Sequence, residues 1–316
     1  MRLFKESKYQ FLAMRRRAYM ISAAMILVGV VALLVRGGLN TGVEFTGGTM
    51  IQVRFSELTD VAEIRGVLND AGITGAQIQP LRAGVGEDKT KPEFLLRLPT
   101  PEGMGIEGVN EQIASGLGSQ YGEDGFEIRE SSGIGPRVGS ELRTKAAMAL
   151  GLSFLLTLIY LAFRFEWKFG FAAITATLHD MTIAFGFIAL LNIEISLATV
   201  AAILTIIGYS LNDTIIVFDR VRENLKKKRK ESYSATLDRS INETLPRTVL
   251  TSGTTLISLL SLFILGGAVI RPFALVLIVG IVIGTYSSIF VASPVLFEIE
   301  ESGRKKSARA AAHSTG

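Results

Sequence analysis

The sequence predicts a membrane α-helical bundle of six transmembrane helices that carries one external α+β domain of the ferredoxin-like type. The first observation behind this prediction is that 48% of the 316 residues are hydrophobic, with a mean hydropathy of +0.39, and that they gather in long uninterrupted runs. The second is that the segment between the first two runs has the size of a domain and alternates strand and helix patterns.

Six apolar runs approach or exceed the roughly 18–20 residues that a membrane-spanning helix needs. They cover residues 18–35, 146–163, 169–191, 195–218, 249–265 and 273–297. The first run follows three arginines, as in a signal peptide, but Arg36-Gly37-Gly38 stands where a small-residue cleavage site would be expected. The first run is therefore predicted to be a retained span.

The distribution of basic residues predicts that both termini lie in the cytoplasm. With that orientation the cytoplasmic segments hold 21 of the 33 Lys and Arg residues, and the short outer loops hold only Arg271. The long segment after the first span translocates largely regardless of its charge. The basic run at residues 226–230 then indicates orientation and contact with anionic lipid headgroups, and no nucleic-acid partner is expected.

These patterns divide the chain into five parts. Residues 1–17 form a cytoplasmic N-terminus, 18–36 the first transmembrane helix, and 37–145 the external domain. Residues 146–297 hold the other five helices, with a basic cytoplasmic loop at 219–247, and residues 298–316 are expected to be a disordered basic tail.

The external domain shows a β-α-β-β-α-β pattern, which is typical of ferredoxin-like folds. Strands are expected at residues 49–55, 76–81, 93–98 and 126–130, and helices at 60–71 and 106–120. Asp60 is a candidate N-cap and Gly72 a candidate C-cap of the first helix. A loop rich in glycine and charge is expected at 83–91.

Glycines flank this domain and predict a hinge on each side. Gly47 and Gly48 precede its first strand, and Gly133 and Gly135 follow its last one. The stretch 133–139 is too rich in glycine for a rigid helix by its composition. Two ordinary linkers are an equally good interpretation.

Asp213 is the most informative single residue, because it lies in the polar pair Asn212–Asp213 inside the fourth apolar run. An ionisable group at membrane depth costs a few kcal/mol or more unless it faces protein, water or an opposite charge. Movement of a proton or an ion is the commonest use of such a group. Arg247 enters the fifth span at a comparable depth and is a candidate counter-charge, although its side chain could simply extend to the lipid phosphates.

Two further polar groups accompany this pair. Arg247, Thr251, Thr254, Ser258 and Ser261 recur at helical spacing and form one stripe, which can serve helix packing or hold a file of waters. In the third span, His179 and Asp180 form a second candidate, either structural or proton-exchanging. Together with Asn212, Thr251 and Thr254 they make up a possible secondary polar site. Glu44 and Glu194, near the outer interface, are expected to be solvated.

Several enzyme classes are not supported. The chain has no H-E-x-x-H, P-loop or G-x-S-x-G motif, and its two membrane aspartates lack the contexts of an intramembrane aspartyl protease. The absence of cysteine excludes disulfides and thiolate metal sites. No catalytic site, metal or organic cofactor is expected.

Particular motifs resemble those of the SecF family of protein-export subunits, within the resistance–nodulation–division (RND) superfamily. They are the stretch 42–48 (GVEFTGG), Leu178-His179-Asp180, the stretch 208–214 (GYSLNDT) with 218–224 (FDRVREN), and 247–252 (RTVLTS). The resemblance extends over roughly residues 15 to 300. It implies one six-span half of an RND-type transporter, in the bacterial inner membrane.

The resemblance also implies a function and partners. It implies that the chain works with SecD beside the SecYEG translocon, with YajC and YidC as further possible partners. The proton-motive force would then drive late steps of preprotein translocation, with Asp213 and Arg247 in the proton path and sodium not excluded as the coupling ion. An exporter half-subunit for lipids or drugs and a non-transporting scaffold of the translocon remain the alternatives.

Overall fold

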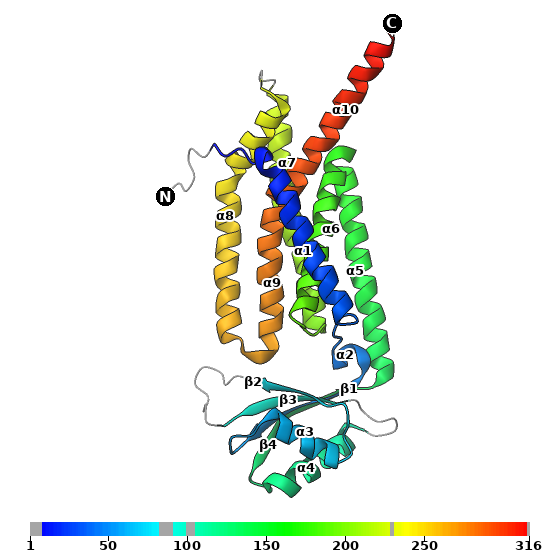
Figure 1. The fold of residues 1–316 in the computed structure, drawn as a ribbon, viewed down its shortest axis with the longest axis vertical. Coiled ribbons are helices and arrows are strands. Elements are labelled where there is room, and N and C mark those ends of the chain that lie inside the picture. The colour runs from blue at the N-terminus through cyan, green and yellow to red at the C-terminus, as the bar shows by residue number, and fades with distance from the viewer. Residues whose placement is uncertain (1–7, 82–90, 99–104, 228–230, 315–316) are drawn as a thin grey trace.

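The computed structural model describes residues 8–81, 91–98, 105–227 and 231–314. It has a bundle of long helices with a small sheet domain at one end (Figure 1). Six of the described helical segments are long and apolar enough to cross a membrane, which agrees with the six predicted spans. The helices are α1 (Arg15–Val35), α5 (Pro136–Arg164), α6 (Trp167–Leu190), α7 (Leu197–Lys226), α8 (Tyr233–Leu265) and α9 (Gly267–Ser287), and α9 continues through a π-helical turn η2 (Ser288–Ala292) into α10 (Ser293–Ser314).

The helices continue well into the segment predicted as a basic cytoplasmic loop at 219–247, so that prediction is wrong for the described residues. Only residues between the end of α7 at Lys226 and the start of α8 at Tyr233 lie outside the two helices. Polar contacts between the helices stabilise this extension, such as Arg220 with Glu243 at 2.5 Å and Asn224 with Ser240 at 3.0 Å. The charged residues from Asp219 onward therefore show where the apolar part of the helices ends, and the helices themselves continue beyond it. Residues 228–230 of the basic run lie outside the described residues.

The predicted disordered tail is also helical, since α10 reaches Ser314. Its composition explains the difference, because alanine, arginine and lysine are strong helix formers. Two ion pairs at i,i+4 spacing, Glu300–Arg304 at 3.3 Å and Glu301–Lys305 at 2.9 Å, add to its stability.

The external domain has the predicted ferredoxin-like topology. The strands β1 (Gly48–Phe55), β2 (Gln77–Leu81), β3 (Glu93–Leu98) and β4 (Phe126–Ile134) form one antiparallel sheet in the order β2-β3-β1-β4. The helices α3 (Val61–Asp70) and α4 (Ile106–Tyr121) cover the face of the sheet that points away from the bundle (Figure 1). Asp60 caps α3 as predicted, because its carboxylate accepts a hydrogen bond from the Ala62 amide at 2.7 Å.

The core of this domain lies between the sheet and its two helices. Alternate residues of β1, among them Ile51, Val53 and Phe55, are fully buried against α3 and α4. The opposite face of the sheet is turned toward the membrane helices (Figure 1).

The junctions between domain and bundle are more ordered than the glycine content suggested. Gly133 lies in β4, and α5 begins at Pro136 directly after its N-cap Gly135 and runs unbroken to Arg164. Residues 136–139 are therefore helical, contrary to the prediction, because proline is well accommodated in the first turn of a helix. On the other side the short helix α2 (Val43–Thr46) precedes Gly47, whose φ is +77°, and Gly48, where a Cβ atom would lie 2.6 Å from the Leu98 carbonyl oxygen. Movement about these glycines stays a prediction.

Close approaches between helices hold the bundle together. A Cβ atom on Gly29 of α1 would lie 2.7 Å from the Cα atom of Gly186 in α6, and one on Gly284 of α9 would lie 2.8 Å from the Cβ atom of Ser210 in α7. Small residues at such crossings allow helices to approach closely in a membrane. The central helices α6 and α7 are thereby fixed against α1 and α9.

Candidate functional site

Asp213 lies inside the bundle, on the face of α7 that packs against α8 and α9. Its side chain is 2% exposed, and its Oδ2 atom has no hydrogen-bond partner among the described residues. Asn212, its neighbour in the predicted polar pair, lies on another side of α7 and is exposed at the surface of the chain. Of the two side chains, only that of Asp213 lies in the interior of the bundle.

Arg247 and Ser252 are the α8 residues whose side chains interact with the Asp213 carboxylate, the first through its charge and the second through its hydroxyl. Arg247 is exposed at the surface of the chain, and no ion pair joins it to Asp213 in the described structure. The structure thus brings the two predicted residues near one another without direct contact.

The hydroxyl stripe of α8 lies on the outside of the bundle. Thr251 and Thr254 are exposed, and each donates a hydrogen bond to a carbonyl oxygen of its own helix, at 2.9 and 3.0 Å. Within this chain the stripe therefore neither packs helices together nor lines an interior path. It forms an outer face of the bundle next to Arg247.

His179 and Asp180 form the centre of a buried network that joins four helices. His179 Nδ1 lies 2.8 Å from Asp180 Oδ1, and His179 Nε2 lies 2.9 Å from the Ser22 hydroxyl of α1. Asp180 Oδ2 accepts hydrogen bonds from Ser287 of α9, at 2.6 Å, and from Ser210 of α7. Both carboxylate oxygens are engaged, in contrast to those of Asp213, so this cluster fixes the helices to one another.

The Asp180 network and Asp213 are neighbours on α7. Ser210, which donates to Asp180, precedes Asp213 by three residues, and Thr214 lies 2.9 Å from Ser288 at the start of the π-helical turn. A π-helical turn inside a membrane helix is frequently found at functional sites. A change in the charge of Asp213 would therefore act directly beside the contacts that hold α6, α7 and α9 together.

Sequence reasoning missed the hydroxyl residues on the inner face of α8, of which Ser252 interacts with the Asp213 carboxylate. Thr244, Thr248 and Ser252 are buried and follow one another at intervals of four, so they form a second stripe on α8, directed inward. The same helical periodicity that singled out the outer stripe could have revealed this one. Composition alone gives no reason to prefer either face.

Within the described ranges no group of three or more His, Cys, Asp or Glu side chains is placed to hold a metal ion.

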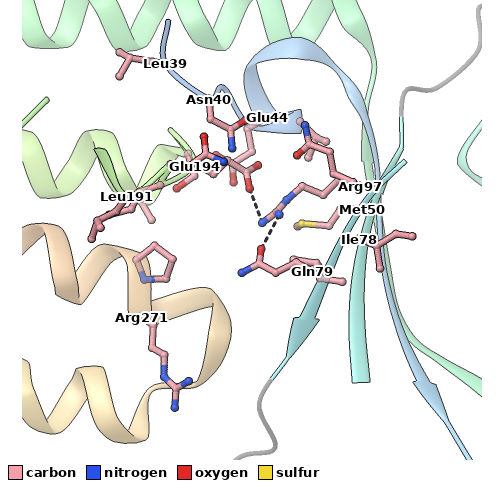
Figure 2. Close-up of a pocket in the computed structure, with 18 of the residues that line it drawn as sticks. Leu39, Asn40, Glu44, Met50, Ile78, Gln79, Arg97, Leu191, Glu194 and Arg271 are labelled. Atoms are coloured by element: carbon pink, nitrogen blue, oxygen red, sulfur yellow. Dashed lines mark hydrogen bonds and ion pairs between the residues drawn. The ribbon is translucent and has the colours of Figure 1, made fainter. Parts of the chain in front are cut away.

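A second polar site lies where the external domain meets the bundle. A cavity of about 880 Å³ separates the inner face of the sheet from the loop between α6 and α7 (Figure 2). Arg97 of β3 crosses this gap, pairing with Glu194 of the loop at 2.5 Å and donating to Gln79 of β2 at 2.9 Å. These residues tie the sheet to the membrane part.

Glu194 is not solvated as expected, whereas Glu44 is half-buried. Burial raises the pKa of the Glu194 carboxyl above its usual value, and the charge of Arg97 offsets only part of this effect. Glu44 accepts a hydrogen bond from the Leu197 amide and so caps the start of α7. Both acids therefore have structural roles at the outer end of the bundle.

Comparison with known families identifies the chain. Residues 117–302 match the model of the protein export membrane protein SecD/SecF C-terminal region, and residues 31–57 match the SecD/SecF GG motif, which contains Gly47 and Gly48. The chain belongs to this SecD/SecF family.

Curated relatives of this SecF-like chain are named protein translocase subunit SecF. The protein from Gemmatimonas aurantiaca is 48% identical over 95% of this chain and 90% of its own length. The one from Desulfurispirillum indicum is 44% identical over 90% of both chains, and the one from Vibrio alginolyticus is 39% identical over 93% of this chain and 90% of its own.

Two solved structures of SecDF share the fold. The structure from Thermus thermophilus, described as a translocon-associated membrane protein, is 37% identical with a TM-score of 0.82 and covers 95% of this chain. A SecDF structure in a "super-membrane-facing form" is 39% identical with a TM-score of 0.67 and covers 97% of this chain. In both cases the chain spans 40% of the length of the solved protein. At almost equal identity and coverage, the TM-score is higher for the first of these two structures.

Proposed function

We propose that the chain is the SecF-type membrane subunit of a Sec protein-export machinery and that it uses the proton-motive force, with a SecD partner, to promote late steps of preprotein translocation. The observation that supports this most directly is the Asp213 carboxylate, which is 2% exposed within membrane helices and has one oxygen without a partner. A buried carboxylate without a full set of partners is stabilised by binding a proton. Binding and release of that proton would change the packing of α7 against its neighbours.

The proposal includes a partner because this chain is one half of a larger assembly. SecDF proteins of the solved structures are much longer, and this chain matches 40% of their length. A SecD partner would supply the second six-helix half and further acids for a complete proton path. The outer face of α8, with Arg247, Thr251 and Thr254, is available to such a partner.

The remaining assignments follow from the same proposal. The chain would lie in the bacterial inner membrane with both termini in the cytoplasm and would act beside SecYEG on unfolded preproteins, without a catalytic site of its own. YajC, YidC and anionic lipids are further candidate partners. Replacement of protons by sodium would appear as sodium-dependent export in vesicles without a proton gradient.

The experiment replaces Asp213 with asparagine, which keeps the size of the side chain but removes its charge and its titration. The chain is expressed with its SecD partner, and export into inverted membrane vesicles is measured with and without a proton gradient. We expect the gradient-dependent part of export to fall at least about tenfold, while membrane insertion and co-purification with SecD stay unchanged.

Asp219→Asn is the matched control. This aspartate lies six residues further along α7 and pairs with Arg164 at 2.6 Å at the exposed end of the helix, so its loss should leave the gradient response intact. Export by Asp213→Asn at the normal, gradient-dependent rate would refute the proposal and favour a scaffold without transport.

A further inference from the structure

One hydroxyl of α8 differs from all the others around it. Between Ser240 and Ser261, a fully described stretch, every other serine and threonine hydroxyl is hydrogen-bonded: Ser252 pairs with Thr285 of α9, and the rest donate to carbonyl oxygens of their own helix. Thr248 is 2% exposed, and its Oγ1 atom has no partner in the described structure. Its hydroxyl is thus turned away from the helix backbone that would normally satisfy it.

The register of α7 against α8 shows what lies opposite Thr248. The two helices run antiparallel, and Tyr209 contacts Thr255 at 3.3 Å while Asn224 contacts Ser240 at 3.0 Å. Between these two contacts Asp213 falls opposite Ser252, whose hydroxyl interacts with its carboxylate. Thr248 lies four residues, or about one turn, from Ser252 on the same buried face, roughly 6 Å further along the helix axis at 1.5 Å per residue.

By this register the two buried oxygens without partners, Asp213 Oδ2 and Thr248 Oγ1, lie within about one helical turn of one another along the α7–α8 pair. A buried polar atom without a partner destabilises the folded state, and native proteins satisfy such atoms with protein groups or ordered water. A carboxylate only accepts hydrogen bonds, whereas a hydroxyl donates and accepts. A single water molecule can donate to the carboxylate and share a hydrogen bond with the hydroxyl, so it satisfies both.

We propose that Asp213 and Thr248 hold a water molecule between α7 and α8, and that Thr248 is the positioning residue of the proton-exchange step at Asp213. This inference rests on the proposed proton-coupled function. When the bound molecule arrives as hydronium, one proton passes to Oδ2, which leaves a neutral carboxyl group and a neutral water. The reverse transfer restores the carboxylate. Three charged or titratable groups face this site from the surrounding helices. Arg247 on α8 acts on the Asp213 carboxylate through its charge, Asp180 on α6 is hydrogen-bonded to Ser210 three residues before Asp213, and Tyr209 on α7 contacts Thr255 of α8.

The test replaces Thr248 with valine, which keeps the shape of the side chain and removes the hydroxyl. In membranes that contain the chain and its SecD partner, infrared difference spectra on a pH step report the carboxyl band of protonated Asp213, identified by its loss in Asp213→Asn. We expect Thr248→Val to shift this band to higher frequency, because the carboxyl loses a hydrogen-bond partner, and to reduce gradient-dependent export about tenfold, which corresponds to about 1.4 kcal/mol. Thr248→Ser should restore both.

Thr244→Val is the matched control, because this threonine lies one turn away on the same buried face and its hydroxyl already donates to the Ser240 carbonyl at 3.0 Å. It should change neither the band nor the gradient response. If Thr248→Val does not insert, Thr248→Ala removes the same hydroxyl without adding bulk.

The outcomes separate this inference from the proposed function. An unchanged band and unchanged export in Thr248→Val, with Asp213→Asn inactive, would overturn the water site and leave the proton-coupled function standing. Full activity of Asp213→Asn would overturn the function itself. Failure of Thr248→Ser to restore the band would also count against the bound water.

Discussion

The ion pair between Arg97 and Glu194 gives the sharpest prediction about how the external domain is held on the bundle. Replacing Arg97 with methionine removes the charge and keeps a long side chain, and it leaves Glu194 without its cation. The two side chains are 17% and 15% exposed, so the pair lies between a fully buried and a surface pair. Loss of one partner costs 3–5 kcal/mol for a buried pair and at most about 1 kcal/mol for an exposed one. We therefore expect a cost of roughly 2 kcal/mol, or about a 30-fold shift toward the undocked domain.

The same pair predicts how docking depends on pH. Burial holds the pKa of Glu194 above its usual value when the domain is docked, and a solvated glutamate has a pKa near 4.3. The docked form therefore binds a proton more tightly than the undocked form. The contribution of Glu194 to docking is fully present below the undocked pKa and is lost as the pH rises through the docked pKa. Arg97→Met removes a positive charge that lowers the pKa of Glu194 in the docked form. The loss of the Glu194 contribution to docking should therefore occur at higher pH in this variant.

The absence of cysteine from the chain makes the measurement direct. Cysteines introduced at the exposed positions Ser119 on α4 and Leu265 at the end of α8 carry spin labels, and the distance between the labels reports docking between pH 5 and pH 8. A double-mutant cycle of Arg97→Met with Glu194→Gln gives the coupling energy of the pair.

Arg129→Met serves as the control, because its partner Glu127 lies on the same strand and both side chains are exposed. It should leave the distance distribution unchanged. If Arg97→Met also shows the wild-type distribution at every pH in this range, the ion pair does not hold the domain, and the argument from its burial fails.

Two predictions concern packing and capping. Gly186→Leu should displace α1 and lower the free energy of unfolding by about 1–3 kcal/mol in a thermal denaturation assay, since a Cβ atom there would lie 2.7 Å from the Cα atom of Gly29. Gly253→Leu is the control and should be tolerated, because nothing lies within 4 Å of a Cβ atom at that position. An equal loss of stability in both variants would contradict this reasoning. Asp60→Ala removes the N-cap of α3 at a cost of about 1 kcal/mol, so amide hydrogen exchange in the first turn of α3 should become about fivefold faster. Unchanged exchange would show that the cap contributes nothing.

The architecture could be predicted from the sequence because hydrophobic run length and strand alternation are local signals. The domain topology, the six spans and the Asp60 cap all follow from patterns within a few residues of one another. The ends of the helices were predicted poorly for a related reason. Ion pairs such as Arg220–Glu243 extend α7 and α8 beyond the apolar segment, and they depend on two helices meeting.

The candidate site was predicted only in part because a sequence does not show which face of a helix is buried. Asp213 was identified because a carboxylate in an apolar run is unusual by itself. Thr251 and Thr254, which were predicted to belong to a secondary polar site, lie on the outer face of α8, whereas Thr248 and Ser252 lie on the inner one. The Arg97–Glu194 pair joins residues almost a hundred positions apart, so no local pattern could indicate it.

The position of α7 connects the two sites that the structure defines. Its first residue, Leu197, is capped by Glu44, and the loop immediately before it carries Glu194, the partner of the external domain. Asp213 lies sixteen residues further along the same uninterrupted helix, which corresponds to about 24 Å at 1.5 Å per residue. Because a helix is stiff along its axis, a shift of α7 caused by a change in the charge of Asp213 moves its capped end as well. Glu44 and Glu194 would then transmit that movement to α2 and to β3, so a single helix is sufficient to connect proton exchange in the membrane with motion of the external domain.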